Sequence, residues 1–274
     1  MASREEAVWR RAPLGAGQSL DLLTARFDRH VYAPHSHAEY TIGVCVGGLE
    51  VIDYRGGRLH VGPGEIVILE PGEVHTGGPG TTDGYAYRAL YAPQSLLAGA
   101  AGEPSHFAQP VVDDPALAAA LRTAHTELSA QPADALEAES RLSWLLGALA
   151  TRHGSARPDR DPGSGSDRIA RAVRDRLADE LLAPPALTEL AADFGLSRYQ
   201  LLRAFRDTMG LPPYAWLAQH RVARARVLLE HGLRPAEVAG LVGFADQAHL
   251  TRWFRRVLGV TPAAYRNSVQ DGLR

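Results

Sequence analysis

The sequence predicts an α+β protein in which a small antiparallel β-barrel with two helices is followed by an all-α domain of two helix-turn-helix units. Three observations support this prediction. Short β-prone runs with Gly and Pro turns extend to about residue 91, leucines then recur at helical spacing, and the last hundred residues contain an internal repeat.

The predicted barrel covers residues 18–110, after an N-terminal tail of residues 1–17. Its β-prone runs, 40–46, 49–54 and 65–69, are separated by turn pairs such as Gly47-Gly48 and Pro63-Gly64. Closely spaced short strands with such turns are typical of a small antiparallel barrel or sandwich.

Two amphipathic helices are expected within residues 111–153. Their apolar residues at helical spacing are Leu117, Leu121, Ala124 and Leu128, then Leu142, Leu145, Leu146 and Leu149. Such a pair either packs on the barrel or mediates homodimerisation. Residues 154–167 (GSARPDRDPGSGSD) have almost no apolar content and are therefore expected to form a flexible linker.

Charge is distributed unevenly along the chain. The net charge is only −2, yet residues 1–155 carry 11 arginines against 18 acidic residues, and residues 156–274 carry 18 against 13. A basic C-terminal half is compatible with phosphate binding. No apolar run approaches about 18 residues and the N-terminus lacks a signal-peptide layout, so we expect a cytoplasmic protein without a membrane partner.

The domain at residues 168–274 contains one unit twice. Nine residues return at a constant offset of 49: Ser197, Arg198, Leu201, Arg203, Phe205, Arg206, Gly210, Pro213 and Trp216 match Asp246, Gln247, Leu250, Arg252, Phe254, Arg255, Gly259, Pro262 and Tyr265. Each copy has a short apolar helix, a turn that begins at Gly195 or Gly243, and a second helix capped by Ser197 or Asp246. This is the composition of a helix-turn-helix.

The second helix of each copy is expected to face DNA, because Arg can bind guanine and Gln adenine in the major groove. The residues expected to contact DNA are Arg198, Tyr199, Gln200, Arg203, Arg206, Gln247, Ala248, His249, Thr251, Arg252 and Arg255. A solvated arginine face on an ordinary bundle would explain one copy, but it is a poor explanation for two copies in register. The helix expected at 213–231 would span roughly 27 to 30 Å, close to the roughly 34 Å between successive major-groove faces.

The segment GFADQAHLTRWFRRVLGVTPAAYR, residues 243–266, resembles the signature of AraC/XylS-type transcription regulators. The resemblance implies double-stranded promoter DNA as partner, with RNA polymerase as a further partner if the protein is an activator. It places base-facing positions on Tyr199, Arg203, Gln247, Ala248 and Arg252. Leu202 and Ala248 depart from the polar residues common at such positions, so the preferred bases are not predictable.

Three histidines lie in the predicted barrel: His35 and His37 in HSHAEY, and His75 in PGEVH. This HxH…PGxxH pattern resembles the two motifs of the cupin barrel, which AraC-type regulators commonly use to sense a small-molecule effector. The histidines could bind a divalent metal, although no cofactor is required, or they could bind an organic effector or one another. Thr41 and Ile42 stand where metal-binding cupins supply a glutamate. The other pocket candidates are Glu39, Tyr40, Tyr85 and Tyr87.

Two other functions are compatible with parts of the sequence. A metal-dependent cupin enzyme fused to a helical domain would use the three histidines, but the missing glutamate counts against it and we expect no enzymatic activity. A protein-interaction scaffold would use the helix-turn-helix units without DNA, and it would show no steep salt dependence.

Overall fold

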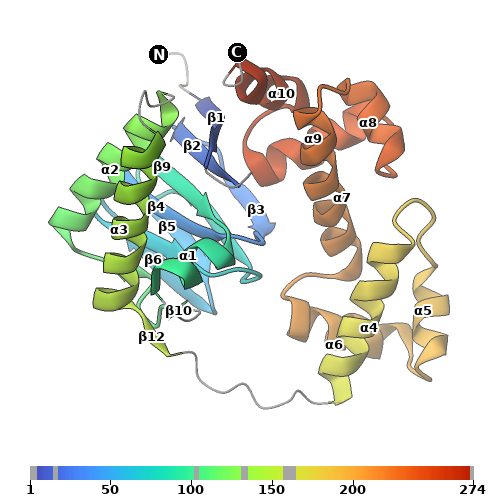
Figure 1. The fold of residues 1–274 in the computed structure, drawn as a ribbon. Helices are drawn as coiled ribbons and strands as arrows, with labels where there is room; N and C mark the ends of the chain where they lie inside the picture. Colours follow the sequence, from blue (N-terminus) through green and yellow to red (C-terminus); the bar gives the residue numbers. More distant parts are fainter. Residues whose placement is uncertain (1–4, 15–17, 102–104, 131–134, 157–164, 272–274) are drawn as a thin grey trace. The chain divides into compact units, whose positions relative to one another are not determined.

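A computed structural model describes residues 5–14, 18–101, 105–130, 135–156 and 165–271. The chain divides into two compact units, with the main break in the sequence between residues 158 and 159 (Figure 1). This break falls inside the predicted linker 154–167. Residues 157–164 of that linker lie outside the described residues, whereas Ser155–Ala156 form strand β12 and Gly165 begins helix α4.

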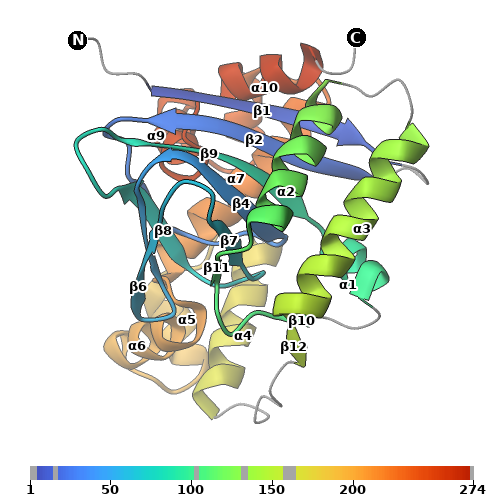
Figure 2. The same ribbon diagram turned by 90° about the vertical axis from the view of Figure 1, so that its left-hand side faces the viewer.

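The N-terminal unit contains two antiparallel sheets that face each other (Figure 2). The six-stranded sheet has the order β1 (Glu5–Pro13), β2 (Ser19–Phe27), β9 (Tyr85–Ala92), β4 (Tyr40–Gly48), β7 (Ile66–Leu69) and β11 (Val111–Val112). The four-stranded sheet has the order β3 (Tyr32–His35), β8 (His75–Pro79), β5 (Glu50–Tyr54) and β6 (Gly57–Val61). A short pair joins β10 (Ser105–His106) to β12.

Strand β1 corrects the expectation that residues 1–17 form a tail. It pairs along its whole length with β2, and Trp9 in its centre is 1% exposed. The segment contains Arg4, Glu5, Glu6, Arg10 and Arg11, which hid its strand character. Alternate residues of an edge strand face solvent, so a charged strand can still bury one face.

Alternation along the strands gives the six-stranded sheet two buried faces. Even-numbered residues of β4 and β9, such as Ile42 and Leu90, pack against helices α1 (Gln94–Ala101), α2 (Pro115–Ser129) and α3 (Ala135–His153). Odd-numbered residues, such as Tyr87 and Tyr91, face the four-stranded sheet, and we call the space between the sheets the barrel interior. The two predicted helices are therefore present as α2 and α3, which cover one face of the sheet (Figure 1). Their leucines belong to the same buried cluster as the sheet residues.

The C-terminal unit is helical throughout its described residues. Its helices are α4 (Gly165–Asp179), α5 (Leu187–Asp193), α6 (Arg198–Met209), α7 (Pro213–Glu230), α8 (Pro235–Leu241), α9 (Gln247–Leu258) and α10 (Pro262–Asp271). The helix expected at 213–231 is α7, which ends one residue earlier than expected, whereas α10 was not expected as a separate helix. Within the described part of the chain, no helix is long and apolar enough to cross a membrane.

Candidate nucleic-acid interface and effector site

The internal repeat appears in the structure as two units with the same local geometry. The turns use Gly195 and Gly243 at φ of 63° and 85°, and α6 and α9 end on Gly210 and Gly259 at 72° and 73°. Such left-handed conformations favour glycine, because a side chain there approaches its own carbonyl. The sequence repeat therefore reproduces backbone shape at both the turn and the helix end.

Both second helices begin on a side-chain cap. Ser197 Oγ accepts a hydrogen bond from the Gln200 N–H at 3.3 Å, and Gln200 Oε1 in return accepts from the Ser197 N–H at 2.9 Å. Asp246 Oδ1 accepts from the His249 N–H at 2.6 Å. Each cap satisfies an N–H group that the first helical turn leaves free. In this arrangement the side-chain oxygen of Gln200 is engaged with the helix end.

The apolar face of each second helix is buried. Leu201 and Phe205 of α6, and Leu250 and Phe254 of α9, are fully buried. Trp253 is also buried, which the sequence analysis did not predict, and its ring lies under the Arg256 guanidinium at 5.6 Å. These contacts fix which side of each helix can face a partner.

Most of the residues expected to contact DNA lie on the opposite, exposed side. The exposed ones are Arg198, Tyr199, Gln200, Arg203, Arg206, Gln247, Ala248, Arg252 and Arg255, whereas His249 and Thr251 are half-buried. Tyr199 is 74% exposed, a high value for an aromatic residue. Arg203 makes only a loose exposed ion pair with Asp207 at 3.7 Å, a contact that is worth little in water. Both helices thus present arginine to solvent.

A buried arginine joins the second turn to the first half of the domain. Arg221 of α7 is 8% exposed, and its Nη2 and Nε donate to the Leu181 carbonyl oxygen at 2.6 and 3.1 Å. Its guanidinium also lies over the Phe244 ring at 5.9 Å. Burial lowers the pKa of Arg221, because removing the charged guanidinium from water is unfavourable. The contacts with Leu181 and Phe244 offset this desolvation. Arg221 therefore holds the second turn against the connection between α4 and α5.

In the barrel interior, the three predicted histidines lie together. The ring nitrogens that could each bind one ion, one from His35, one from His37 and one from His75, all lie within 4.8 Å of one another. His35 is the last residue of β3 and pairs directly with His75 of β8, while His37 follows the end of the strand. The cluster thus depends on strand pairing and not on alternation along a single strand.

Backbone carbonyls orient two of these rings. His35 Nδ1 lies 2.8 Å from the Ala33 carbonyl oxygen and His75 Nδ1 lies 3.1 Å from that of Glu73. A carbonyl only accepts, so each Nδ1 carries the proton and each Nε2 offers a lone pair. Burial lowers the pKa of His75 to about 4 and that of His35 well below its usual value, so both rings are neutral at pH 7.

Aromatic rings continue the interior beyond the histidines. Tyr32 lies 5.4 Å from His35 between ring centroids, and its hydroxyl is 3.0 Å from the Tyr87 hydroxyl. Tyr85 stacks parallel to Tyr87 at 5.8 Å. On the other side, the Tyr91 ring contacts both His37, at 5.0 Å, and Trp9, at 4.9 Å. The interior is therefore lined by phenols and imidazoles.

The other predicted pocket residues have different positions. Tyr85 and Tyr87 face the interior, as expected, but Tyr40 lies on the helix side of β4, where it packs near Phe107. This corrects its assignment to the pocket, because Tyr40 is an even-numbered residue of a strand whose odd-numbered residues face inward. Glu39 is half-buried and is not part of the histidine cluster. Sequence reasoning missed Tyr32 and Glu50, since nothing local marks an inward face on strands so short.

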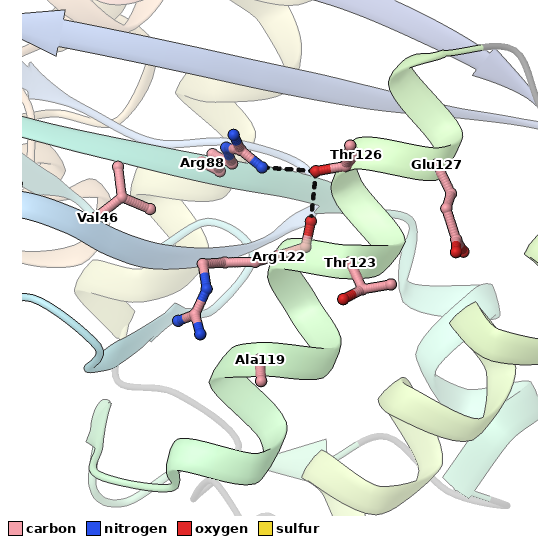
Figure 3. A pocket seen from close by; sticks show the side chains of 7 residues that line it. All are labelled: Val46, Arg88, Ala119, Arg122, Thr123, Thr126 and Glu127. Carbon is pink, nitrogen blue, oxygen red and sulfur yellow. Dashed lines mark hydrogen bonds between the residues drawn. The ribbon is translucent and has the colours of Figure 1, made fainter.

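A separate groove lies outside the barrel between the six-stranded sheet and α2 (Figure 3). Arg88 of β9 donates to Thr126 Oγ1 at 2.6 Å, and Thr126 in turn donates to the Arg122 carbonyl oxygen at 2.8 Å. Its lining is Val46, Arg88, Ala119, Arg122, Thr123, Thr126 and Glu127. Because Arg88 lies on the opposite face of β9 from Tyr87, this groove is distinct from the histidine site.

Comparison with known families gives one match for each unit. Residues 17–146 match the family described as AraC-like ligand binding domain, and residues 190–268 match a helix-turn-helix domain family. Together these matches cover most of the chain.

Curated relatives match about four fifths of the chain, and a solved structure with a similar fold covers nearly all of it. The chain is 27% identical to the HTH-type transcriptional regulator YbfI of Bacillus subtilis, over 79% of this chain and 80% of that protein. It is also 27% identical to the arabinose operon regulatory protein of Salmonella typhimurium, over 83% of each. ToxT from Vibrio cholerae with bound unsaturated fatty acid has a similar fold, with a TM-score of 0.57 at 11% identity over 99% of this chain and 97% of that one.

Proposed function

Because the chain belongs to the AraC/XylS family of transcription regulators, with a ligand-binding domain followed by a helix-turn-helix DNA-binding domain, we propose that α6 and α9 read successive major-groove segments on one face of promoter DNA. The observation that supports this proposal is the duplication of one capped helix with an exposed arginine face. Helix α7 has 18 residues and so spans about 27 Å. That length suits two recognition helices, α6 and α9, placed about one turn of the DNA double helix apart.

Within this interface, Arg203 and Arg252 take the central role. Both are exposed at equivalent positions of the repeat, and an arginine can donate two hydrogen bonds to one guanine. Tyr199, Gln247, Thr251 and the half-buried His249 supply further contacts to bases or sugars. Arg198, Arg206 and Arg255 are better suited to phosphates, which position the protein without reading sequence.

Selection of bound duplexes from a random pool, followed by titration with salt, tests this function. We expect enrichment of a defined sequence, and an affinity for it that falls steeply as the salt concentration rises, because bound phosphates release counterions. Absence of enrichment, or binding that does not depend on salt, would contradict the proposal and would favour a protein-interaction scaffold.

The barrel interior is the proposed site for a small-molecule effector. One similar structure is ToxT with bound unsaturated fatty acid, so a protein of this fold can bind a small organic molecule. In this chain the ligand would contact the histidines and tyrosines between the two sheets. Binding would change DNA affinity only if the two states of the protein bind the ligand with different affinity.

Helices α2 and α3 are the proposed homodimer contact. Both pack on the sheet by their leucines, yet α3 leaves Trp144 57% exposed, and exposed aromatic residues are enriched at protein interfaces. A regulator that binds promoter DNA acts in the cytoplasm, and an activator would also contact RNA polymerase. Since the relatives are regulators, we assign the chain no catalytic activity.

The histidine cluster favours a second ligand, a divalent first-row metal ion. Three clustered imidazoles suit zinc, iron or nickel, and backbone carbonyls that orient the other ring nitrogen, as they do for His35 and His75, are typical of metal-binding histidines. Such a metal would have an open coordination position toward the tyrosines, where it could bind an effector oxygen. No acidic residue joins the cluster among the described residues.

Metal analysis of the full chain after incubation with Zn²⁺ and desalting tests this site. We expect about one bound ion per chain, and a loss of affinity in His75→Ala that exceeds the roughly 10- to 100-fold cost of losing an outer-shell partner. His60→Gln, at an exposed position of β6, is the matched control and should bind like the parent protein. If His75→Ala retains the ion, or if the parent protein binds none, the metal assignment is wrong.

A further inference from the structure

A buried carboxylate in the barrel interior has no cation of its own. Glu50 of β5 is 7% exposed, and its Oε1 lies 3.0 Å from the position that a Cβ would take on Gly77. Among the described residues, its side chain makes no ion pair and no hydrogen bond. Glu70, the other carboxylate buried to this degree in the described part of the chain, contacts Arg55 at 2.9 Å. Leaving a charge buried and unpaired is costly, so such a residue requires an explanation.

Three tyrosines interact electrostatically with the Glu50 carboxylate. Tyr32 comes within 3.4 Å of the same point above Gly77. Burial raises the pKa values of Tyr32, Tyr85 and Tyr87, and the charge of Glu50 adds a smaller contribution in the same direction. The Tyr85 hydroxyl is buried and, within the described part of the chain, has no hydrogen-bond partner. A carboxylate and a phenol are therefore both free to bind a ligand at one place.

The groups that line this place suit a positively charged ligand. Ring faces of tyrosine attract cations, and the nearby histidines His35 and His75 are kept neutral by burial. The chain contains no lysine at all. A ligand with a positive group would find several acceptors here, while a ligand carboxylate would meet Glu50.

We propose that the ligand-binding domain recognises a small organic amine, whose protonated nitrogen lies between the Glu50 carboxylate and the rings of Tyr32, Tyr85 and Tyr87. The body of the ligand extends along the aromatic rings toward the histidine cluster. This assignment rests on the proposed effector role of the barrel interior and gives that effector its chemical class.

The raised pKa of Glu50 is what a buried carboxyl group without a positively charged neighbour should have. Burial raises the pKa of Glu50 to about 8, so much of the carboxyl is protonated at neutral pH without a ligand. An ammonium group beside it would favour the ionised form, and the new ion pair would offset the desolvation of both charges. The amine therefore supplies the positive charge that would pair with Glu50.

Calorimetric titration of the full chain with matched compounds tests the proposal. Benzylamine, benzyl alcohol and benzoate form one set, and butylamine, butanol and butyrate form a second, all measured with EDTA present so that no metal contributes. We expect at least one amine to bind roughly 10- to 100-fold more tightly than its alcohol and carboxylate counterparts, the range of a charge-assisted hydrogen bond.

Two variants separate recognition from folding. Glu50→Gln keeps the shape and removes a buried charge, so it should fold like the parent protein while it loses the preference for the amine. Asp53→Asn is the control, because Asp53 lies on the same strand but is exposed and pairs with Arg58. The proposal is overturned if no amine is preferred over its counterparts, or if Glu50→Gln binds the amine unchanged.

The DNA titration distinguishes failure of this inference from failure of the proposed function. Should the chain bind its selected duplex with steep salt dependence but prefer a carboxylate or an alcohol, only the amine assignment falls. Should it bind no duplex at all, the regulatory function itself is contradicted.

Discussion

Replacing Arg203 and Arg252 together with alanine is expected to cost about 2 to 6 kcal/mol of binding free energy to the selected duplex, because each residue that reads a base contributes about 1 to 3 kcal/mol. The two positions lie in separate units, so their effects should be nearly additive. Each single variant should also relax the preference for bases at its own part of the site. Competition between the selected duplex and single-base variants measures both effects.

The control for this experiment is Arg171→Ala. Arg171 is an exposed arginine of α4, outside both capped helices, and its removal changes the net charge by the same amount as either single variant. If Arg171→Ala weakens binding as much as Arg252→Ala, the domain binds by charge alone. If neither Arg203 nor Arg252 matters, α6 and α9 do not face the bases.

Gly243→Ala is expected to lower the free energy of unfolding by about 2 to 4 kcal/mol. Part of this loss is the roughly 1 to 2 kcal/mol cost of placing a side chain in the left-handed region, where Gly243 sits at φ of 85°. The rest is steric, since the new Cβ would lie 2.8 Å from the Leu181 carbonyl oxygen and 2.9 Å from Arg221 Nη2. Chemical denaturation followed by circular dichroism measures the change.

Two further glycines provide the controls. Gly195→Ala meets the same backbone cost at φ of 63° but has no atom within 4 Å of its Cβ, so the difference between the two variants isolates the junction at Arg221. Gly240→Ala, in helix α8 with open space around it, should gain roughly 0.5 to 1 kcal/mol. Equal losses of unfolding free energy in Gly195→Ala and Gly243→Ala would mean that the contacts around Arg221 rearrange to fit the new Cβ at no energetic cost.

The C-terminal domain was largely predictable because its signals are local. Caps at Ser197 and Asp246, glycines after the helices and a repeat at constant spacing each mark an element by neighbouring residues alone. The clustering of His35, His37 and His75 was expected from the HxH and PGxxH motifs, but the direct pairing of His35 with His75 was not predicted. Helix α10 was not predicted, because its residues Pro262 and Tyr265 were considered only as the last matching positions of the repeat.

The remaining parts of the barrel depend on contacts between distant segments. Strand β1 is visible only once β2 pairs with it, and the inward position of Glu50 follows from β5 and β8 lying side by side. Tyr40 was assigned to the wrong face, since the alternation of a fully buried strand does not show which face covers which core. Local patterns therefore predicted the elements, but only the sheet pairing identified the residues of the candidate effector site.

The contact between Arg221 and Leu181 makes the DNA-binding half of the chain asymmetric along its length. It holds two unlike surfaces in a fixed head-to-tail order, with Tyr199 and Arg203 in one unit and Gln247 and Ala248 at the start of the other. A chain that reads DNA with such a pair recognises a non-palindromic sequence. If that sequence is inverted in the promoter, the protein binds in the opposite orientation. One protomer alone would thus distinguish upstream from downstream.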